Sequence, residues 1–219
     1  MKSSITKAHL YEHVARIGKA LASPKRLELI ELLAQGEKTV EVLAAQASID
    51  IRLASAHLKA LREARLVETR RDGKFIHYRL SGPDVAQLWR TLRETAEEHL
   101  IELRVALSQL VATPDALSAE NRESLLAKAR SGDIVVIDVR PENEYAAGHL
   151  PFARSMPLAE LEKRLGDLPA DTQIVAYCRG PYCLMSDEAV RLLRQRGFVA
   201  HKISDGVTEW LAHGLPIET

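Results

Sequence analysis

The fold of this chain is constrained most by seven residues near its carboxyl end that hold both of its cysteines, Tyr177-Cys178-Arg179-Gly180-Pro181-Tyr182-Cys183. Residues 172–177 are apolar and β-branched, which predicts a short buried strand. Residues 184–196 place apolar and charged side chains at helical spacing and are followed by Gly197, which predicts an amphipathic helix. We therefore expect Cys178 in a tight loop between the end of a strand and the start of a helix.

A cysteine in that position has the setting of a nucleophile. Loop N–H groups and the positive end of a helix stabilise an anion, and Arg179 is expected to add a positive charge. Together these effects predict a lowered thiol pKa, which makes Cys178 a thiolate nucleophile near neutral pH. The alternative is a small buried hydrophobic residue, which the strand–loop–helix setting disfavours.

Cys183, at the end of the same loop, has two interpretations. In the first, it is a resolving cysteine that attacks a persulfide or sulfenate on Cys178 and forms a disulfide within the loop. In the second, it only packs at the start of the helix. Both remain open at this point, because a disulfide needs the two Cα atoms within about 7 Å and a sequence contains no distances.

Composition and charge indicate a cytoplasmic protein with an anionic partner. No apolar run approaches the ~18 residues of a membrane span, no secretion signal is apparent, and two cysteines do not make a disulfide framework. The formal net charge is zero, but residues 52–79 hold eight basic residues against three acidic ones. A basic segment in a neutral chain predicts binding to an anion such as nucleic acid, and no membrane partner is expected.

The apolar pattern of the first half predicts a helix-turn-helix. Helices are expected at residues 5–21, from Pro24 to about Gly36, at 39–46 and, with Asp50 as N-cap, at 51–64. A short helix, a turn and a helix with a basic polar face match a motif whose second helix enters the major groove of DNA. That polar face carries Arg52, Ser55, Lys59 and Arg62.

A basic hairpin, or wing, is expected directly after that helix. Asp72-Gly73 separates two alternating runs, residues 66–71 and 74–80, and is a strong hairpin signal. The alternative, an ordinary solvated face, is disfavoured because the basic helix and basic hairpin occur in this order. The residues predicted to contact DNA are Arg52, Ser55, His57, Lys59, Arg62, Arg70, Arg71 and Lys74.

These motifs resemble the ArsR/SmtB family of winged-helix repressors over roughly residues 10–105. The resemblance implies a homodimer that binds double-stranded operator DNA, with the first and last helices of this half at the dimer interface. The motifs that carry it are residues 21–27, Ser55-x-His57-Leu58-Lys59-x-Leu61-Arg62, Leu66-Val67 and Tyr78-Arg79-Leu80.

The predicted last helix of this half is long and carries an apolar stripe at spacings of three and four residues, which suits a dimer interface. The alternative is that the stripe packs against its own domain. Its members are Leu88, Leu92, Ala96, Leu100, Leu103, Leu107 and Leu110.

The positions at which many members of that family bind metals are not filled in this chain. Where they carry a Cys-x-Cys pair at the start of the third helix, this chain has no cysteine. His99 and Glu102 match the later half of a second family site, but Ala86 and Leu88 stand at its earlier positions. Half a site cannot complete a tetrahedral shell, so we expect no metal.

The second half is predicted to be an α/β domain. Pro114 interrupts the long helix, which divides the chain into a winged-helix DNA-binding and dimerisation domain at 1–112 and a second domain at 113–219. In the second domain, strands at 134–139, 172–177 and 200–203 alternate with helices at 117–129, after Pro141, and at 158–165, 184–196 and 207–213. Such alternation predicts a parallel sheet with helices on both faces and ligands at the carboxyl ends of its strands.

This half resembles the rhodanese (sulfurtransferase) family over residues 118–217. The resemblance implies that Cys178 takes sulfur from a donor such as thiosulfate or a persulfide, becomes a persulfide, and passes the sulfur to a thiol or to cyanide. Residues 179–183 are expected to supply N–H groups for the bound sulfur anion, and no cofactor other than this covalent persulfide is expected. The matching motifs are Asp138-Val139-Arg140-Pro141-x-x-Glu144-Tyr145-x-x-Gly148-His149-Leu150, Tyr177-Cys178-Arg179-Gly180 and Asp205-Gly206-Val207-x-x-Trp210-x-x-x-Gly214-x-Pro216.

Two details refine this interpretation. Asp138, Arg140 and Glu144 are interpreted as a structural ion network that supports the loop rather than as catalysts. Phosphatases related to this fold place an arginine six residues after the cysteine, where this chain has Leu184. Tyrosine-phosphatase chemistry is therefore not expected.

The main hypothesis is a cytoplasmic, homodimeric repressor in which persulfidation or oxidation of Cys178 changes affinity for the operator. In the alternative, the protein is an active sulfurtransferase, and the winged helix serves as a dimeriser or tethers the enzyme to DNA.

Overall fold

The computed structural model describes residues 6–110 and 122–219. The chain divides into two compact units, Met1–Arg93 and Glu94–Thr219, and the division falls inside a helix, α5 (Pro83–His99). The domain boundary predicted between residues 112 and 113 lies outside the described residues. So does the beginning of the helix predicted from residue 117, of which the structure describes α7 (Arg122–Ser131).

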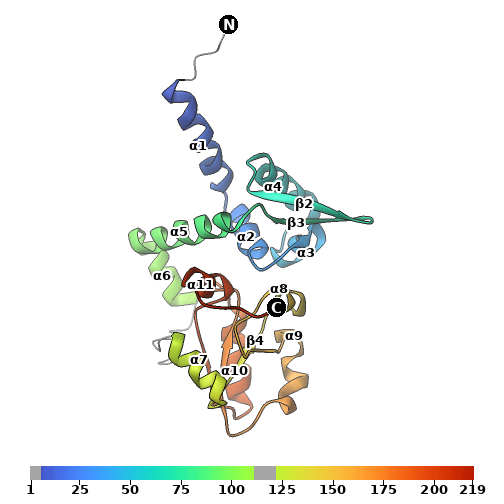
Figure 1. Cartoon of the computed structure of the whole chain (residues 1–219), viewed down its shortest axis with the longest axis vertical. Coiled ribbons are helices and arrows are strands. Elements are labelled where there is room, and N and C mark those ends of the chain that lie inside the picture. Colours follow the sequence, from blue (N-terminus) through green and yellow to red (C-terminus); the bar gives the residue numbers. More distant parts are fainter. Residues whose placement is uncertain (1–5, 111–121) are drawn as a thin grey trace. The chain divides into compact units, whose positions relative to one another are not determined.

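The first unit is a winged helix-turn-helix, as predicted (Figure 1). The apolar faces of its helices meet in one core, and α1 extends beyond that core at its amino end. The most deeply buried residues of the core include Leu29, Ile30, Leu43, Leu58 and Leu61. The helices are α1 (Lys7–Leu21), α2 (Pro24–Leu33), α3 (Val40–Gln46) and α4 (Ile51–Glu63), followed by α5.

The turn between α3 and α4 has a defined local cause. Ser48 has a φ of +52°, which reverses the chain after α3. The backbone N–H of Leu53 then donates to Oδ1 of Asp50 over 2.9 Å, so the prediction that Asp50 caps α4 is confirmed. Leu58 and Leu61 bury the opposite face of α4, which leaves its polar face exposed.

The wing is formed by β2 (Val67–Asp72) and β3 (Phe75–Leu80), but its turn lies one residue later than predicted. Asp72 pairs with Phe75, so the two loop residues are Gly73 and Lys74. Gly73 has a φ of +58°, a conformation that glycine adopts without steric cost. A third strand, β1 (Lys38–Thr39), pairs with β3 and was not predicted, because two residues carry no alternating pattern.

The prediction of one long helix across residues 88–110 is wrong. The structure has α5 and α6 (Ile101–Leu110), which are interrupted at Leu100. The N–H of Leu100 still donates to the carbonyl of Ala96, while its own carbonyl accepts from the N–H of Leu103, so one helix ends and another begins there. The apolar stripe nevertheless remains largely exposed, with Leu88, Leu92, Leu100 and Leu110 between 38% and 63% accessible.

The second unit contains a parallel sheet in the order β5-β4-β6-β7, with every neighbouring pair parallel. This confirms the predicted fold class. The strands are β4 (Ile134–Asp138), β5 (Arg154–Ser155), β6 (Gln173–Tyr177) and β7 (Ala200–Lys202). The helices after α7 are α8 (Glu142–Ala147), α9 (Leu158–Leu161), the 3₁₀ helix η2 (Glu162–Asp167), α10 (Met185–Gln195) and α11 (Val207–Ala212).

Side chains of the central strands alternate between two apolar clusters. Ile137 and Cys178 pack in a cluster with residues of α9 and α10, whereas Val136 and Tyr177 pack in a cluster with residues of α7 and α11. Helices therefore cover both faces, as the near-continuous apolar strands predict. None of the helices in the described part of the chain is long and apolar enough to cross a membrane.

Replacing Asp50 with alanine is expected to reduce the stability of the first unit by about 1 kcal/mol, because the N–H of Leu53 loses its capping acceptor. Calorimetric unfolding of the full chain measures this as a lower transition temperature. Ser23→Ala is the matched control, because the hydroxyl at that N-cap makes no capping hydrogen bond among the described residues. Equal effects of the two substitutions would contradict the assigned cap.

Candidate functional site

The cysteine loop lies at the carboxyl end of β6, in the predicted place. Cys178 follows the last strand residue directly and is 2% exposed. Gly180 has a φ of +147°, and its carbonyl accepts a hydrogen bond from the N–H of Cys183 over 3.1 Å. Pro181 and Tyr182 form the half-buried turn between them, and α10 begins at Met185.

The structure joins Cys178 to Cys183 by a disulfide, with 6.2 Å between their Cα atoms. The distance requirement left open by the sequence is therefore met. Cys183 also packs against the apolar cluster that contains Cys178, so it both bonds to the nucleophile candidate and contacts the core. The loop can exist with its two sulfurs linked.

Arg179 is not positioned as the sequence led us to expect. Its guanidinium donates to Glu144 through Nε and Nη2, over 2.9 and 2.8 Å, and Glu144 is fully buried. The positive charge that was expected to stabilise a thiolate on Cys178 is therefore compensated by a carboxylate. The Arg179–Glu144 ion pair instead links the loop to α8.

Asp138 and Arg140 form a second buried ion pair. The Nε of Arg140 lies 3.0 Å from each oxygen of Asp138, and its Nη2 donates to the carbonyl of Gly148 over 2.7 Å. Tyr177 donates to Oδ2 of Asp138 over 2.6 Å and accepts from the N–H of Leu150. Burial, and next the charge of Asp138, raise the pKa of Tyr177, so its hydroxyl stays protonated.

Two residues further along the chain, Gly206 and Glu209, lie against the loop, and no role was predicted for either. A Cβ on Gly206 would lie 2.4 Å from the carbonyl oxygen of Arg179, so only glycine allows α11 to approach the loop this closely. Glu209, which is 7% exposed, accepts from the N–H of Gly206 over 3.0 Å. Its Oε2 would lie 3.1 Å from a Cβ on Gly180.

A capping pattern at the start of α11 could have indicated Glu209. Glutamate three residues after an N-cap commonly bonds back to the cap N–H, and Gly206-x-x-Glu209 fits this pattern. No local sequence pattern indicates that Glu209 lies beside Gly180, because the two residues are far apart in the chain and come together only in the folded protein.

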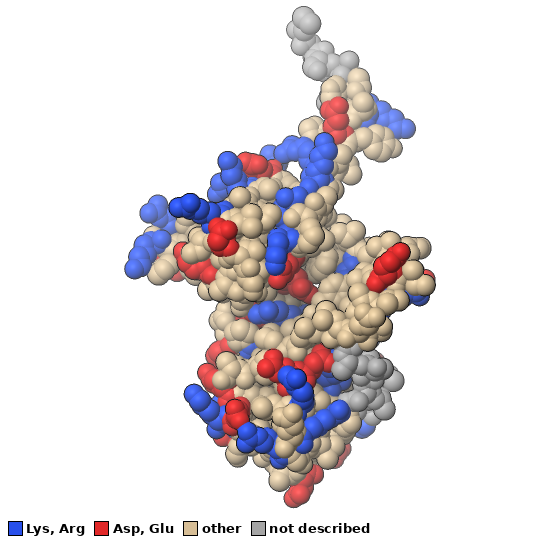
Figure 2. All heavy atoms as spheres, turned by 180° about the vertical axis from the view of Figure 1, so that it is seen from behind, with Lys and Arg blue, Asp and Glu red and all other residues tan. Residues whose placement is uncertain are grey.

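The polar, basic face predicted on α4 is exposed in the structure, and its contact with DNA stays a prediction. Arg52, Ser55, Lys59 and Arg62 are all exposed, and Lys59 lies 3.9 Å from Glu63 one turn further on. Figure 2 shows Lys and Arg side chains gathered around the outer end of the β2–β3 hairpin, interspersed with acidic groups. Helix and wing therefore present basic side chains to solvent, as DNA binding requires.

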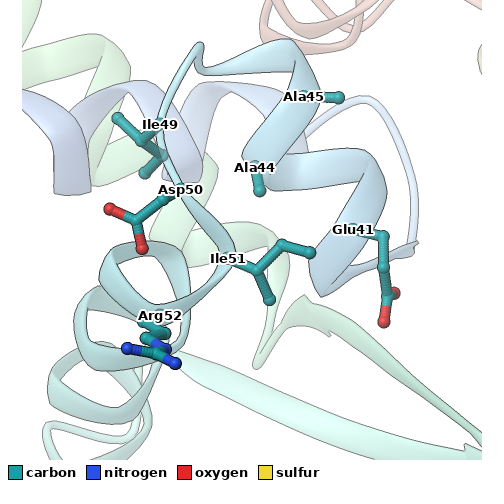
Figure 3. A pocket seen from close by; sticks show the side chains of 7 residues that line it. All are labelled: Glu41, Ala44, Ala45, Ile49, Asp50, Ile51 and Arg52. Atoms are coloured by element: carbon teal, nitrogen blue, oxygen red, sulfur yellow. The ribbon is translucent and has the colours of Figure 1, made fainter.

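A hollow of about 690 Å³ lies between α3 and the start of α4 (Figure 3). Ile49 and Ile51 flank Asp50 in the segment that enters α4, and Ile51 points toward α3. Glu41 and Arg52 lie at its rim, so the hollow ends at the polar face of α4.

His57 does not belong with the other DNA-binding candidates. It is partly buried, and its pKa is lowered first by burial and then by the charge of Arg26 on α2. At 3.6 residues per turn, position 57 lies well away from the stripe of 52, 55, 59 and 62. His57 was predicted to contact DNA because it belongs to a motif that resembles the family. The geometry of the helix places it away from the polar face.

The wing carries less uncompensated charge than its sequence suggests. Arg70 is hydrogen-bonded to Glu37 and Asp72, and the bond to Glu37 is the main cause of its raised pKa. Arg71 and Lys74 lie at the exposed tip, where Arg71 bonds the carbonyl of Gly73 and Lys74 lies over a phenyl ring. Of the three predicted wing residues, Arg71 and Lys74 are therefore the better placed for phosphate contacts.

No group of three metal-ligating side chains is found in residues 6–110 and 122–219. The absence of a metal in this protein remains a prediction from the unfilled family positions.

Together the two units define a winged-helix DNA-binding protein that carries a rhodanese-like cysteine loop. Comparison with known families agrees, since the bacterial regulatory protein, arsR family, matches residues 23–69 and the rhodanese-like domain matches residues 121–213. The HTH-type transcriptional regulator Rv0324 of Mycobacterium tuberculosis is 44% identical over 212 residues, which cover 97% of this chain and 93% of that protein. The chain therefore belongs to the ArsR family of bacterial transcriptional regulators, with a rhodanese-like domain in its second half.

Two other similarities each concern one half of the chain. A sulfurtransferase of Allochromatium vinosum is 32% identical over 90 residues, which cover 41% of this chain and 82% of that protein. A solution structure of the homodimeric winged helix-turn-helix DNA-binding domain of a possible ArsR-family regulator from Mycobacterium bovis is 45% identical. It covers 47% of this chain and 94% of its own, with a TM-score of 0.43.

Replacing Glu144 with glutamine is expected to destabilise the second unit by about 3 kcal/mol, because Arg179 loses the buried carboxylate that compensates its charge. Calorimetry of the full chain tests this. Asp167→Asn is the matched control, since its ion pair with Arg164 is exposed and worth under about 1 kcal/mol. If both substitutions had small effects, the Glu144–Arg179 pair would not hold the loop.

Proposed function

We propose that this protein is a sulfur-responsive transcriptional regulator, in which a persulfide on Cys178 alters operator binding. The observation that carries the proposal is that both cysteines of the chain lie in one loop, within disulfide distance, at the carboxyl end of a buried strand. Open parallel sheets bind ligands at that edge. A thiol there, beside a second thiol, suits a sensor that changes covalent state.

The chemistry can proceed without an external oxidant. The Cys178 thiolate attacks the outer sulfur of a persulfide donor R–S–SH, forms a new S–S bond and releases R–S⁻. The Cys183 thiolate then attacks the Cys178 sulfur of this persulfide, which forms the loop disulfide and releases HS⁻. The sulfane sulfur is reduced to sulfide while the two thiols are oxidised, so the electrons balance.

We propose that the DNA-binding form is a homodimer. Apolar side chains remain exposed on α1, at Leu10 and Val14, and on α5 and α6, at Leu88, Leu92 and Val105. Unpaired apolar helix faces of this kind are characteristic of an interface. A dimer presents two copies of α4 to the two half-sites of a palindromic operator.

A regulator that needs reduced thiols as its resting state belongs in a reducing compartment, so we propose a cytoplasmic location. Regulation further requires that the modified and unmodified chains differ in their affinity for DNA.

Sulfur transfer as the main activity is the second candidate function. The similarity of the second half to a sulfurtransferase favours it. In this case the persulfide on Cys178 is passed to an external thiol before Cys183 reacts, and the winged helix serves as a dimeriser or a DNA tether.

Treatment with a persulfide donor is expected to change the affinity of the reduced full-length protein for its own upstream DNA by about tenfold, within the usual range of allosteric coupling. The same treatment should leave Cys178→Ser unaffected, whereas Cys183→Ser should accumulate the persulfide without forming the disulfide. Fluorescence anisotropy gives the affinities and intact mass gives the covalent state. Unchanged affinity together with rapid, Cys178-dependent turnover to cyanide would favour the sulfurtransferase function instead.

Arg62→Ala is expected to weaken operator binding by about 1–3 kcal/mol for a base contact, or to lower the slope of log affinity against log salt by about one for a phosphate contact. Anisotropy titrations at several salt concentrations distinguish the two.

In the wing, Arg71→Ala should weaken binding more than Arg70→Ala, because Arg70 is engaged by Glu37 and Asp72. Binding that is indifferent to salt and to all three substitutions would rule out this surface.

A further inference from the structure

The two cysteines of the oxidised loop differ in their exposure to solvent. Cys178 is 2% exposed and belongs to the buried apolar cluster that it shares with residues of α9 and α10. Cys183 packs against the same cluster but remains partly exposed, and the next residue, Leu184, is 42% exposed. Solvent therefore reaches Cys183 and is almost excluded from Cys178.

The backbone around Cys178 is covered as well. A Cβ on Gly206 would lie 2.8 Å from the carbonyl oxygen of Cys178 and 2.4 Å from that of Arg179, so the start of α11 closes this side of the loop. Tyr177, directly before Cys178, has no exposed surface. An external nucleophile can reach the Cys178 sulfur only if these elements move apart.

The position of Cys183 is fixed by the first turn of α10. In this turn, Oδ1 of Asp187 lies 2.5 Å from the Nζ of Lys202 on β7, and Lys202 is 5% exposed. The N–H of Cys183 donates to the carbonyl of Gly180 over 3.1 Å. Because these contacts fix the backbone on both sides of Cys183, the difference in exposure between the two cysteines is a property of the fold.

We propose that Cys183 is the sulfur at which a thiol reductant attacks the oxidised loop, and that Cys178 is the sulfur released. Sulfane sulfur then enters the loop at Cys178, and reducing equivalents enter it at Cys183. Only the first of these two steps rests on the proposed function, because the disulfide and the unequal exposure of its cysteines are features of the structure.

The reduction is a thiol–disulfide exchange that needs no reagent other than the reductant. The thiolate R–S⁻ forms a bond to the Cys183 sulfur, the bond between Cys178 and Cys183 breaks, and Cys178 leaves as a thiolate with the electron pair. A second R–S⁻ attacks the sulfur of R in the mixed disulfide, which releases the Cys183 thiolate and R–S–S–R. Two reductant thiols are oxidised while two cysteines are reduced, so the electrons balance.

Cyanide identifies the attacked sulfur, because it cleaves a disulfide and leaves an S-cyano group on the sulfur that it attacks. Full-length protein oxidised with diamide is treated with cyanide in the presence of iodoacetamide, which alkylates the released thiolate. Tandem mass spectrometry then locates both groups. The product with the S-cyano group on Cys183 and the alkyl group on Cys178 is expected in about tenfold excess over the reverse product, because exchange depends on access to the attacked sulfur.

The same protein unfolded in urea is the first control. Unfolding exposes Cys178, so the two products are expected in similar amounts. In the folded protein, iodoacetamide also reaches Cys183 more easily than Cys178, which favours the reverse product. The measured excess is therefore a lower limit.

One substitution tests the structural cause of the preference. Asp187→Asn removes the carboxylate that pairs with Lys202, so the first turn of α10 is held less firmly and the excess should fall toward the value of the unfolded chain. Asp171→Asn is the matched control, because it removes an exposed carboxylate before β6 and should leave the excess unchanged.

The outcomes separate this inference from the proposed function. A product ratio near one in the folded protein, or an S-cyano group mainly on Cys178, would overturn the assignment of Cys183, even if operator affinity responds to a persulfide donor. Attack at Cys183 without any response of operator affinity would retain the assignment and overturn the regulatory function. If cyanide cleaved only the unfolded chain, Cys183 would not be accessible and the assignment would be overturned. The wild-type ratio decides the test even if Asp187→Asn misfolds.

Discussion

The alternation of side chains along β6 governs the chemistry of the second unit, because it directs two neighbouring residues to opposite faces of the sheet. Tyr177 is fixed on the α7 and α11 face by its hydrogen bonds to Asp138 and to the N–H of Leu150. Cys178 must then point to the α9 and α10 face, where Cys183 approaches from the start of α10. A shift of one residue in β6 would exchange the two side chains and place the thiol against the Asp138–Arg140 pair.

Arginine side chains have two different environments in this chain. On α4, exposed basic side chains follow one stripe, which leaves a positive surface suited to phosphates. At the cysteine loop and at the inner part of the wing, arginines are instead tied to carboxylates, Arg179 to Glu144 and Arg70 to Glu37. Arginine therefore stabilises the fold at the cysteine loop and in the wing, whereas on α4 it is exposed and available for binding.

Features of the fold could be predicted from the sequence where the interactions that determine them join residues close together in the chain. The helix-turn-helix, the hairpin and the strand–loop–helix around Cys178 depend on periodicity and turn residues within a few positions. They are found where expected, except that the hairpin turn lies one residue later. The break at Leu100 lies among ordinary helix-forming residues without proline or glycine, so no local signal indicates it. Arg179 and Glu144 are 35 residues apart, and only the folded sheet brings them together.

The close contact between Gly206 and the carbonyl group of Arg179 restricts how the loop can move. Because Gly206 has no Cβ, α11 packs directly against the loop backbone, and the loop cannot move further in that direction. On the other side it continues into α10 after Leu184. Steric contact therefore excludes movement of the loop toward α11, so any rearrangement that accompanies the Cys178–Cys183 disulfide has to occur on its α10 side.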